Sequence, residues 1–401
     1  MKIVHIEDFF HPEAGYQINI LPKYMCLQGH ENYIITSEMK KIPASLTDFF
    51  NIDDLELKDN KFFAETGVKI FRIPLFYFYS GRAIFTSRIF RLVNSINPDV
   101  LYIHGNDTLT AIRFLLKLKK IKFAVVMDSH MLSMASKNMY SEIFRFLYRK
   151  LITPIIVKNS IPVIRTQDDI YVQRHLGIPL AQCPWISVGT DTQLFRVDRQ
   201  IRKRVRKEYD ILEEDMVAIY AGKLDESKGG YFLAQAIADK FNTDRSYVLL
   251  IIGNSSDEYG KSVESIFTLS QNRIIRIPTQ KYKDLAKFYQ ASDFAIFPRQ
   301  CSLSFYDVQA CGLPVIFEDN NINRGRLQGK NGVCFKPGDL MDFRMRIEEM
   351  LNAEETEYVK MRYDSINYIL NGYNYQDITN RYIDLIDEHF EFFRIKKKKL
   401  R

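Results

Sequence analysis

Short, almost entirely apolar runs alternate with segments of helical spacing along most of the chain. The first run covers residues 2–6, and residues 16–29 then place Ile18, Leu21 and Met25 on one side of a helix that ends at Gly29. This alternation predicts an α/β fold in which parallel strands are joined by crossover helices. Further strands are expected at residues 33–36, 68–73, 99–104, 124–127, 161–164 and 184–187.

A highly charged stretch, residues 196–215, interrupts this alternation, and a second α/β series follows it. Because 401 residues exceed what one ordinary core holds, two domains are expected. We predict two Rossmann-like, doubly wound domains that face a central cleft, followed by a C-terminal helix with a basic tail that crosses back to the first domain. Their ranges are 1–187, 188–373 and 374–401. The second series of strands is expected at residues 217–220, 247–252, 274–277, 294–297 and 315–317.

Composition adds little to this picture. With 46% hydrophobic and 26% charged residues the chain has the make-up of a soluble globular protein. A net charge of +7 favours an anionic partner, such as a nucleotide diphosphate, an anionic membrane surface or a nucleic acid. The five cysteines show no C-x-x-C spacing and are expected to be reduced thiols of a cytosolic protein. We expect neither a signal peptide nor a membrane span.

One stretch combines basic and aromatic residues. No Asp or Glu occurs between Thr66 and Pro98, which enclose five basic and seven aromatic residues. Such a composition suits contact with an anionic membrane, stacking on nucleic acid, or an ordinary core helix with solvated arginines. Two further basic and apolar runs, residues 113–123 and 144–158, favour the membrane. Peripheral membrane contact is therefore expected through residues 71–93.

Candidate binding residues follow the predicted strands of both domains, where open α/β sheets bind ligands. The second domain offers mainly glycines and basic residues, which suits a nucleotide diphosphate. The first offers histidines and a carboxylate, which suits an acceptor. A strand, a turn with hydroxyls and a helix in residues 294–312 predict a phosphate site. The acceptor-side candidates are His104, Asn106, Asp128 and His130, and the donor-side candidates include Gly222, Lys223, Lys228, Gly253, Ser302, Leu303 and Ser304.

Five segments of the chain, some of which contain these candidates, together resemble the retaining glycosyltransferases of family 4, which have the GT-B fold. The resemblance covers nearly the whole chain, and it is specific because all five segments occur in the order that the family shows. The segments are Pro12-x-x-Gly15 with Gly29-His30, the D-V-x-x-x-H pattern at 99–104, residues 188–195, the G-x-L-x-x-x-K-G motif at 222–229 with Lys223 for the usual Arg, and A-C-G-x-P-V at 310–315.

The resemblance implies roles for individual residues. Gly15 lets the backbone approach a pyrophosphate, and Lys223 and Lys228 neutralise the departing diphosphate without a metal ion. His130 is expected near the reacting sugar, where it holds a sugar hydroxyl and stabilises the transition state.

The resemblance fails at one position. The family has two glutamates separated by seven residues, and here Arg299 and Asp307 occupy these places. Asp307 keeps a carboxylate for the ribose hydroxyls. Arg299 inverts the charge where the family binds the donor sugar, and the neighbouring Gln300 is a further candidate for that contact.

The resemblance thus implies a hexosyl- or N-acetylhexosaminyltransferase that acts with retention. The donor is a UDP- or GDP-sugar, and the acceptor is a hydroxyl of a glycan or lipid-linked intermediate in surface polysaccharide or glycoconjugate biosynthesis. The location expected is the cytoplasm, with the inner face of the cell membrane as the place of peripheral contact. The main alternative, raised by Arg299, is a catalytically inactive GT-B partner subunit that binds a glycan or another transferase. A nucleotide-sugar epimerase and a nucleic-acid-binding protein are weaker alternatives.

Overall fold

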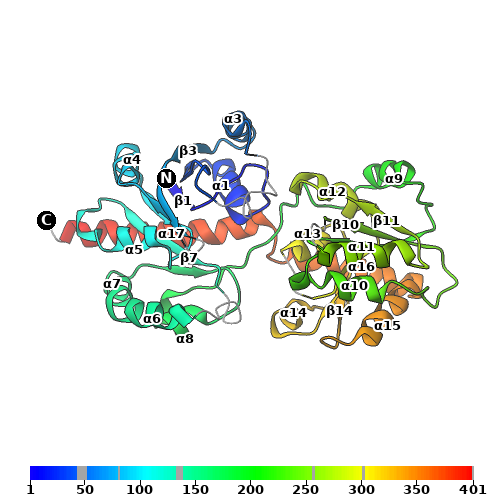
Figure 1. Cartoon of the computed structure of the whole chain (residues 1–401). Coiled ribbons are helices and arrows are strands. Elements are labelled where there is room, and N and C mark those ends of the chain that lie inside the picture. Colours follow the sequence, from blue (N-terminus) through cyan, green and yellow to red (C-terminus); the bar gives the residue numbers. More distant parts are fainter. Residues whose placement is uncertain (43–51, 80–81, 132–138, 255–257, 300–302, 400–401) are drawn as a thin grey trace. The chain divides into compact units, whose positions relative to one another are not determined.

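The chain forms two α/β units (Figure 1). The computed structural model describes residues 1–42, 52–79, 82–131, 139–254, 258–299 and 303–399. Unit one comprises Met1–Val188 and Tyr375–Arg401, and unit two comprises Gly189–Asn374.

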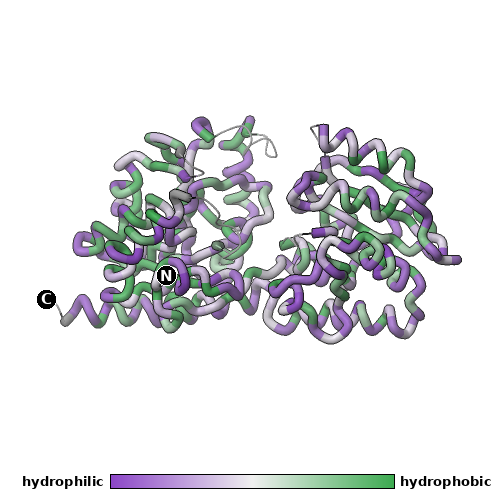
Figure 2. The backbone as a smooth tube through the Cα atoms, turned by 60° about the horizontal axis from the view of Figure 1, so that its bottom comes forward, coloured by the Kyte–Doolittle hydropathy of each residue, from purple (hydrophilic) through white to green (hydrophobic). Residues whose placement is uncertain are grey.

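Unit one is built on a six-stranded parallel sheet of order β3-β2-β1-β6-β7-β8. The central strands are buried along nearly their whole length, because helices cover both faces of a parallel sheet. Figure 2 shows this as apolar colour concentrated in the interior of the unit. The strands are β1 (Lys2–Ile6), β2 (Glu31–Ser37), β3 (Lys69–Ile73), β6 (Val100–Ile103), β7 (Ala124–Ser129) and β8 (Val163–Arg165).

Helices connect these strands, and an antiparallel hairpin precedes β6. The hairpin pairs β4 (Leu75–Tyr79) with β5 (Arg82–Phe85). The helices are α1 (Gln17–Leu27), α3 (Leu55–Thr66), α4 (Arg88–Ile96), α5 (Leu109–Leu115), α6 (Met139–Leu147), α7 (Thr153–Lys158), α8 (Tyr171–Leu176) and α17 (Tyr375–Lys399), with a π-helical turn, η2 (Tyr148–Ile152), between α6 and α7.

Unit two repeats the plan with a parallel sheet of order β11-β10-β9-β12-β13-β14. The strands are β9 (Met216–Ala221), β10 (Tyr247–Ile252), β11 (Ile274–Ile277), β12 (Phe294–Phe297), β13 (Val315–Glu318) and β14 (Gly332–Phe335). The helices are α9 (Arg199–Glu208), α10 (Gly230–Ala236), α11 (Glu258–Leu269), α12 (Tyr282–Ala291), α13 (Ser304–Ala310), α14 (Asn321–Arg326), α15 (Leu340–Leu351) and α16 (Glu355–Leu370), and a short 3-10 turn, η4 (Glu226–Lys228), precedes α10.

The predicted α/β class and the two doubly wound sheets are confirmed, with three local differences. The strand expected at residues 184–187 does not form. Trp185 makes only an isolated bridge with Arg165, and Pro184 lacks the N–H that a strand would need. The aromatic stretch after β3 forms the hairpin, and β14 completes the second sheet; none of these three strands was predicted from the sequence.

The C-terminal helix α17 is part of unit one and packs along α1. Gln17 Nε2 donates to the Tyr382 hydroxyl at 2.7 Å, and Arg381 donates to the Trp185 carbonyl at 2.9 Å. Its basic end is held as well, since Lys396 Nζ donates to the Lys158 carbonyl at 3.3 Å. Among the described residues, no helix is both long and apolar enough to cross a membrane.

Candidate functional site

Asp128 lies at the carboxyl end of β7 and is fully buried. Its carboxylate accepts hydrogen bonds from the Gly105 amide at 2.7 Å and from the Tyr102 hydroxyl at 2.9 Å. His104 Nδ1 and His130 Nε2 lie 2.9 and 3.3 Å from the same oxygen, Oδ2. Burial by itself would raise the pKa of Asp128, but the charges and hydrogen bonds of the two histidines outweigh burial and hold this pKa well below its usual range. Asp128 is therefore an anion inside the protein.

His104 is linked on its other side to a second buried histidine. His104 Nε2 lies 3.1 Å from His5 Nδ1, and His5 Nε2 lies 3.1 Å from Asn32 Oδ1. The Asn32 amide nitrogen donates to the His30 carbonyl at 3.1 Å, so Asn32 Oδ1 is left to accept from His5. Burial lowers the pKa of His5 to about 3, so His5 is neutral and its Nδ1 accepts in turn.

It follows that His104 donates from both ring nitrogens, to His5 and to Asp128. A ring that donates twice is an imidazolium. His104 and Asp128 thus form a buried ion pair whose polar atoms are satisfied by Tyr102, Gly105 and His5. Such a pair persists in a core only when its hydrogen bonds are complete.

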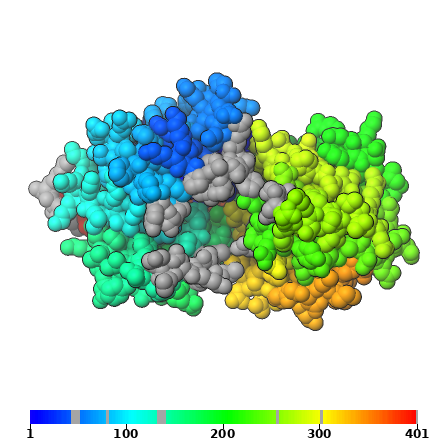
Figure 3. Space-filling view, viewed as in Figure 1, coloured from blue at the N-terminus to red at the C-terminus, as the bar shows by residue number. Residues whose placement is uncertain are grey.

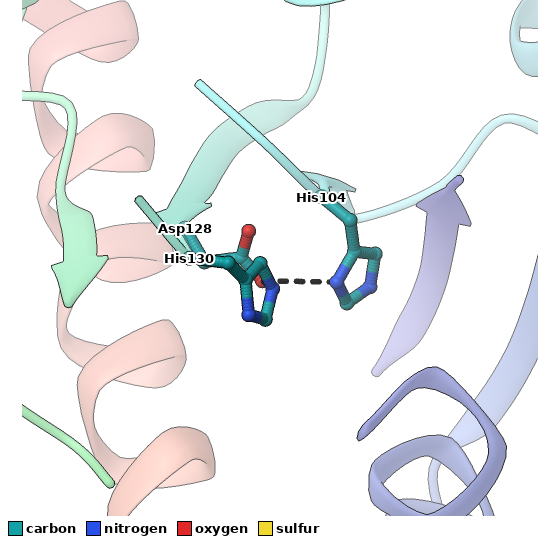
Figure 4. Close-up of side chains that lie close together, drawn as sticks. All are labelled: His104, Asp128 and His130. Carbon is teal, nitrogen blue, oxygen red and sulfur yellow. Dashed lines mark ion pairs between the residues drawn. The ribbon is translucent and has the colours of Figure 1, made fainter. Parts of the chain in front are cut away.

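His130 is the exposed member of this group. Its side chain is 45% exposed, and its Nδ1 lies 3.0 Å from the Thr166 hydroxyl. Figure 4 shows the rings of His104 and His130 converging on the carboxylate of Asp128. Desolvation lowers the pKa of His130, but the charge and hydrogen bond of Asp128 raise it by more, so that the net shift is upward. Asp128 fixes one ring nitrogen of His130 and favours its protonated form.

Two carboxylates beside this group were not among the predicted site residues. Burial raises the pKa of Glu7 to about 7 and that of Asp8 to about 6. Glu7 is close enough to His104, Asp128 and His130 for their charges to affect its pKa. Perturbed carboxyl groups that cluster at the end of a sheet are typical of functional sites. The sequence signal was the Glu-Asp pair directly after the first strand.

Three of the acceptor-side candidates lie deeper than His130. Asn106 and Asp128 are fully buried and His104 nearly so. Asn106 donates to the Tyr148 hydroxyl at 3.1 Å, and both ring nitrogens of His104 are engaged. All three side chains are thus held inside unit one. They form a supporting layer beneath His130.

The same group could be mistaken for a metal site. His104 Nδ1, Asp128 Oδ2 and His130 Nε2 all lie within 4.8 Å of one another, as three metal ligands would. The histidine nitrogens of a metal site must be unprotonated toward the ion. His104 Nδ1 instead carries the proton that it donates to Asp128, which favours a hydrogen-bonded triad.

In unit two, the donor candidates lie on loops at the carboxyl ends of β9, β10 and β12. Lys223 follows β9 and is exposed, and Lys228 ends η4 and is half-buried. The Tyr220 hydroxyl donates to the Lys223 carbonyl at 2.6 Å, and Asp225 Oδ1 accepts from the Lys228 amide at 2.9 Å. These contacts fix the backbone of the loop.

Arg299 reaches this loop from the end of β12. Its guanidinium donates to the Glu226 carbonyl at 3.2 Å, and a Cβ on Gly229 would lie 2.8 Å from its Cγ. Gly229 also has φ +73°, so glycine is favoured there on two grounds. Gly253 packs against the same loop, because a Cβ on it would lie only 1.9 Å from the Gly222 carbonyl oxygen. Predicted donor residues from three strands therefore lie together.

Asp307 lies one turn into α13 and is only 5% exposed. Its Oδ1 accepts from the Thr190 hydroxyl at 2.6 Å and the Tyr282 hydroxyl at 3.2 Å. Burial raises the pKa of Asp307 to about 7, against the opposing effect of these two donors. Thr190 belongs to the predicted 188–195 segment, so the structure joins two of the sequence motifs.

The remaining donor candidates are placed as follows. Leu303 and Ser304 are half-buried at the start of α13, whereas Gln300 and Ser302 lie outside the described residues. Gly15 belongs to unit one, where it is half-buried in the loop between β1 and α1.

Comparison with known proteins agrees with this architecture. The family model "Glycosyl transferases group 1" matches residues 201–368, less than half of the chain but most of unit two. Spore coat protein SA of Bacillus subtilis is 24% identical over 169 residues, which are 39% of this chain and 45% of that protein. The chain therefore spans less than half the length of this curated relative.

Two solved structures match nearly the whole chain. A glycosyltransferase from Rickettsia africae has a TM-score of 0.72 at 13% identity, covering 97% of this chain and 98% of that one. Alr3699/HepE of Anabaena, solved with UDP and glucose, has a TM-score of 0.70 at 14% identity, covering 97% and 100%. The chain has the GT-B fold of these structures.

Proposed function

We propose that the protein is a glycosyltransferase that moves a sugar from a nucleotide diphosphate to a hydroxyl group. One observation carries this proposal: the loops at the ends of β9, β10 and β12 lie inside the region matched by the glycosyl transferase family model. These loops carry Lys223, Lys228 and Arg299, and their glycines leave the backbone accessible to a ligand.

Unit two binds the nucleotide diphosphate in this proposal. Lys223 and Lys228 supply positive charge to the diphosphate as the sugar departs. Asp307 accepts hydrogen bonds from the ribose hydroxyls. Its Oδ1 would take these bonds in exchange for those that it now accepts from the Thr190 and Tyr282 hydroxyls. The nucleotide is UDP or GDP, and UDP is supported by Alr3699/HepE, which was solved with UDP and glucose.

Unit one binds the acceptor and places His130 near the reacting sugar. The bond between the anomeric carbon and the diphosphate breaks, and a bond to the acceptor oxygen forms on the same face. The acceptor proton passes to the departing diphosphate oxygen. In this proposal His130 Nδ1 exchanges the Thr166 hydroxyl for a hydroxyl of the reacting sugar, while Asp128 keeps holding Nε2. His130 thereby orients that sugar in the transition state. No metal ion takes part.

The acceptor is a glycan or a lipid-linked intermediate of surface polysaccharide or glycoconjugate biosynthesis, and the transferred group is a hexose or N-acetylhexosamine. Residues 71–93 supply part of the support for a membrane-linked acceptor. Their hairpin exposes Phe76 and Tyr77, and it is tied to the sheet end by the hydrogen bond from the Ala83 amide to Asp8 at 3.1 Å. We propose that the enzyme acts in the cytoplasm, on the inner face of the membrane.

The test is release of nucleotide from a panel of UDP- and GDP-sugars, with and without candidate glycan and lipid acceptors. We expect one donor to be turned over, and Lys228→Ala and His130→Ala to lose most of this activity. Lys203→Ala, an exposed lysine on α9, is the matched control and should keep it. If no donor is bound or turned over, the proposal is wrong.

A non-catalytic partner subunit is the second candidate, and Arg299 is the observation that favours it. Its guanidinium lies on the η4 carbonyl, at the position where related enzymes carry a carboxylate for the donor sugar. Thermal shifts with UDP and with GDP separate the two candidates, because a partner subunit that lost the donor site would be stabilised by neither.

A further inference from the structure

The helical segment 139–158 of unit one has a second apolar face that the core does not use. Its inner face is formed by Tyr148, Ile152 and Ile156, which are almost inaccessible. Its outer face exposes Ile143, Phe146 and Leu151 by 62%, 60% and 61%. Leu147 and Val157 are exposed beside them.

These exposed positions form one continuous stripe. Steps of three or four residues connect 143 with 146 and 147, 147 with 151, and 151 with 157 through the exposed Pro154. Residues at such steps lie on the same side of a helix. A helix at the surface of a globular protein normally presents polar residues to water. Packing inside unit one therefore does not explain the stripe, and contiguous exposed apolar side chains of this kind mark interaction sites.

Positive charge surrounds the stripe. No Asp or Glu occurs between Glu142 and Asp168, and Glu142 itself pairs with Arg145 at 2.5 Å. Arg149, Lys150 and Lys158 are exposed on the same segment.

The lysine-rich end of α17 lies beside this segment. Lys396 Nζ donates to the Lys158 carbonyl at 3.3 Å, and Lys397 Nζ donates to the Ile121 carbonyl. These contacts bring the end of α17 together with the exposed Lys120 and Lys122. Apolar and basic side chains thus occur together over one part of unit one.

The aromatic stretch 71–93 differs in this respect. Its Arg72 pairs with Asp59 at 2.6 Å, and its Arg82 pairs with Asp107 at 2.6 Å. Internal carboxylates thus neutralise two of its charges. The stripe keeps its basic neighbours without such carboxylates in its own sequence.

We propose that the 143–158 stripe, with the lysines at the end of α17, docks unit one on the anionic surface of a lipid bilayer. The apolar side chains enter the boundary between headgroups and acyl chains, and the lysines lie at the phosphate level. Figure 3 shows this segment at the outer surface of unit one, in the teal-green part at lower left. The proposal does not depend on the transferase activity.

The experiment is co-sedimentation of the full chain with vesicles of phosphatidylcholine alone and of phosphatidylcholine mixed with phosphatidylglycerol. We expect binding to the mixed vesicles that weakens with salt. Phe146→Ser with Leu151→Ser should lower the partition coefficient roughly ten-fold or more. Lys150→Glu and Lys158→Glu should each lower it roughly five-fold or more. Leu57→Ser, at a leucine of α3 that is 67% exposed, is the matched control.

Circular dichroism spectra and melting curves establish that each variant is folded. Absence of binding to the mixed vesicles would overturn the proposal, as would equal binding by wild type and stripe variants. Self-association of the wild type that the stripe variants abolish would show that a second copy of the chain covers the stripe, and would overturn it too. Because no sugar nucleotide is used, the outcome is separate from that of the transferase test.

Discussion

Two buried aspartates, one in each unit, have opposite ionisation behaviour. Asp128 in unit one and Asp307 in unit two are 0% and 5% exposed, so desolvation disfavours the charge of both. The pKa of Asp128 nevertheless lies well below its usual range, whereas that of Asp307 is raised to about 7.

The difference lies in the partners of each carboxylate. Asp128 faces two histidines, one of which carries both ring protons, as well as a hydroxyl and an amide. Asp307 has two hydroxyl donors and a second acidic group, Asp191, near it. Burial alone therefore does not determine whether a carboxyl group is ionised. The presence of a cationic partner determines it. In unit one the charge is already compensated, whereas in unit two a ligand with hydroxyl donors could still lower the pKa of Asp307.

The largest effect is expected from Asp128→Asn. In this variant the His104 imidazolium stays buried without a counter-ion. The groups that donate to Asp128 then face either the amide nitrogen, which cannot accept a hydrogen bond, or the amide oxygen, which accepts less strongly than a carboxylate. We expect a loss of about 3–5 kcal/mol in the free energy of unfolding, measured with urea. Asp168→Asn removes a side chain that is 72% exposed, 3.6 Å from Arg165, and should cost less than about 1 kcal/mol. Equal losses would refute the buried ion pair.

Asp307→Asn should behave in the opposite way, and its effect should depend on pH. A folded-state pKa of about 7 exceeds the ordinary value of 3.8, so the folded state binds more protons between these values. Wild-type stability therefore falls as pH rises from about 4 to about 7. The variant lacks this loss and should gain about 1–2 kcal/mol on wild type between pH 5 and pH 8. The check is to measure the free energy of unfolding of wild type and variant at several pH values. A difference that does not change with pH would show that the Asp307 carboxyl is already charged in the folded protein, and would contradict the prediction.

The charge of Lys228 on the donor loop should affect nucleotide affinity more than the free energy of unfolding. Lys228→Ala should change the free energy of unfolding by no more than about 1 kcal/mol. Its affinity for the nucleotide should fall roughly ten- to hundred-fold, because a charged hydrogen bond to a phosphate is lost. Lys203→Ala should alter neither quantity, and a destabilised Lys228→Ala would instead assign this lysine to the core of the loop.

No effect is expected from a chelator. If His104, Asp128 and His130 are joined by protons, EDTA should change neither the melting temperature nor the turnover of the donor. Elemental analysis of the purified protein for zinc is the direct check. Stoichiometric zinc that chelation removes with loss of stability would make the triad a metal site.

The sheets were predictable because parallel strands buried on both faces carry continuous apolar runs, as in residues 124–127 and 247–252. The hairpin β4–β5 was not, because aromatic and basic residues in alternation also fit an amphipathic segment. The strand expected at 184–187 failed at Pro184, whose missing N–H limits pairing to one bridge.

For the site, strand ends indicated His104, Asp128 and His130, since ligand sites of open sheets lie there. Their division of roles was not predictable. His5 occupies an apolar strand and gave no sign that it contacts a histidine 99 residues away. The supporting layer depends on such tertiary distances, which the order of residues along the chain does not contain.

The central claim is that unit two binds the nucleotide while His130 of unit one acts on the reacting sugar. Calorimetric titration of UDP or GDP into wild type, His130→Ala and Lys228→Ala, with turnover measured on the same samples, tests it most directly. The account predicts that His130→Ala binds nucleotide as wild type does but loses turnover, whereas Lys228→Ala loses affinity roughly ten-fold or more. Nucleotide affinity that falls equally in both variants, or that is absent from wild type, would contradict it.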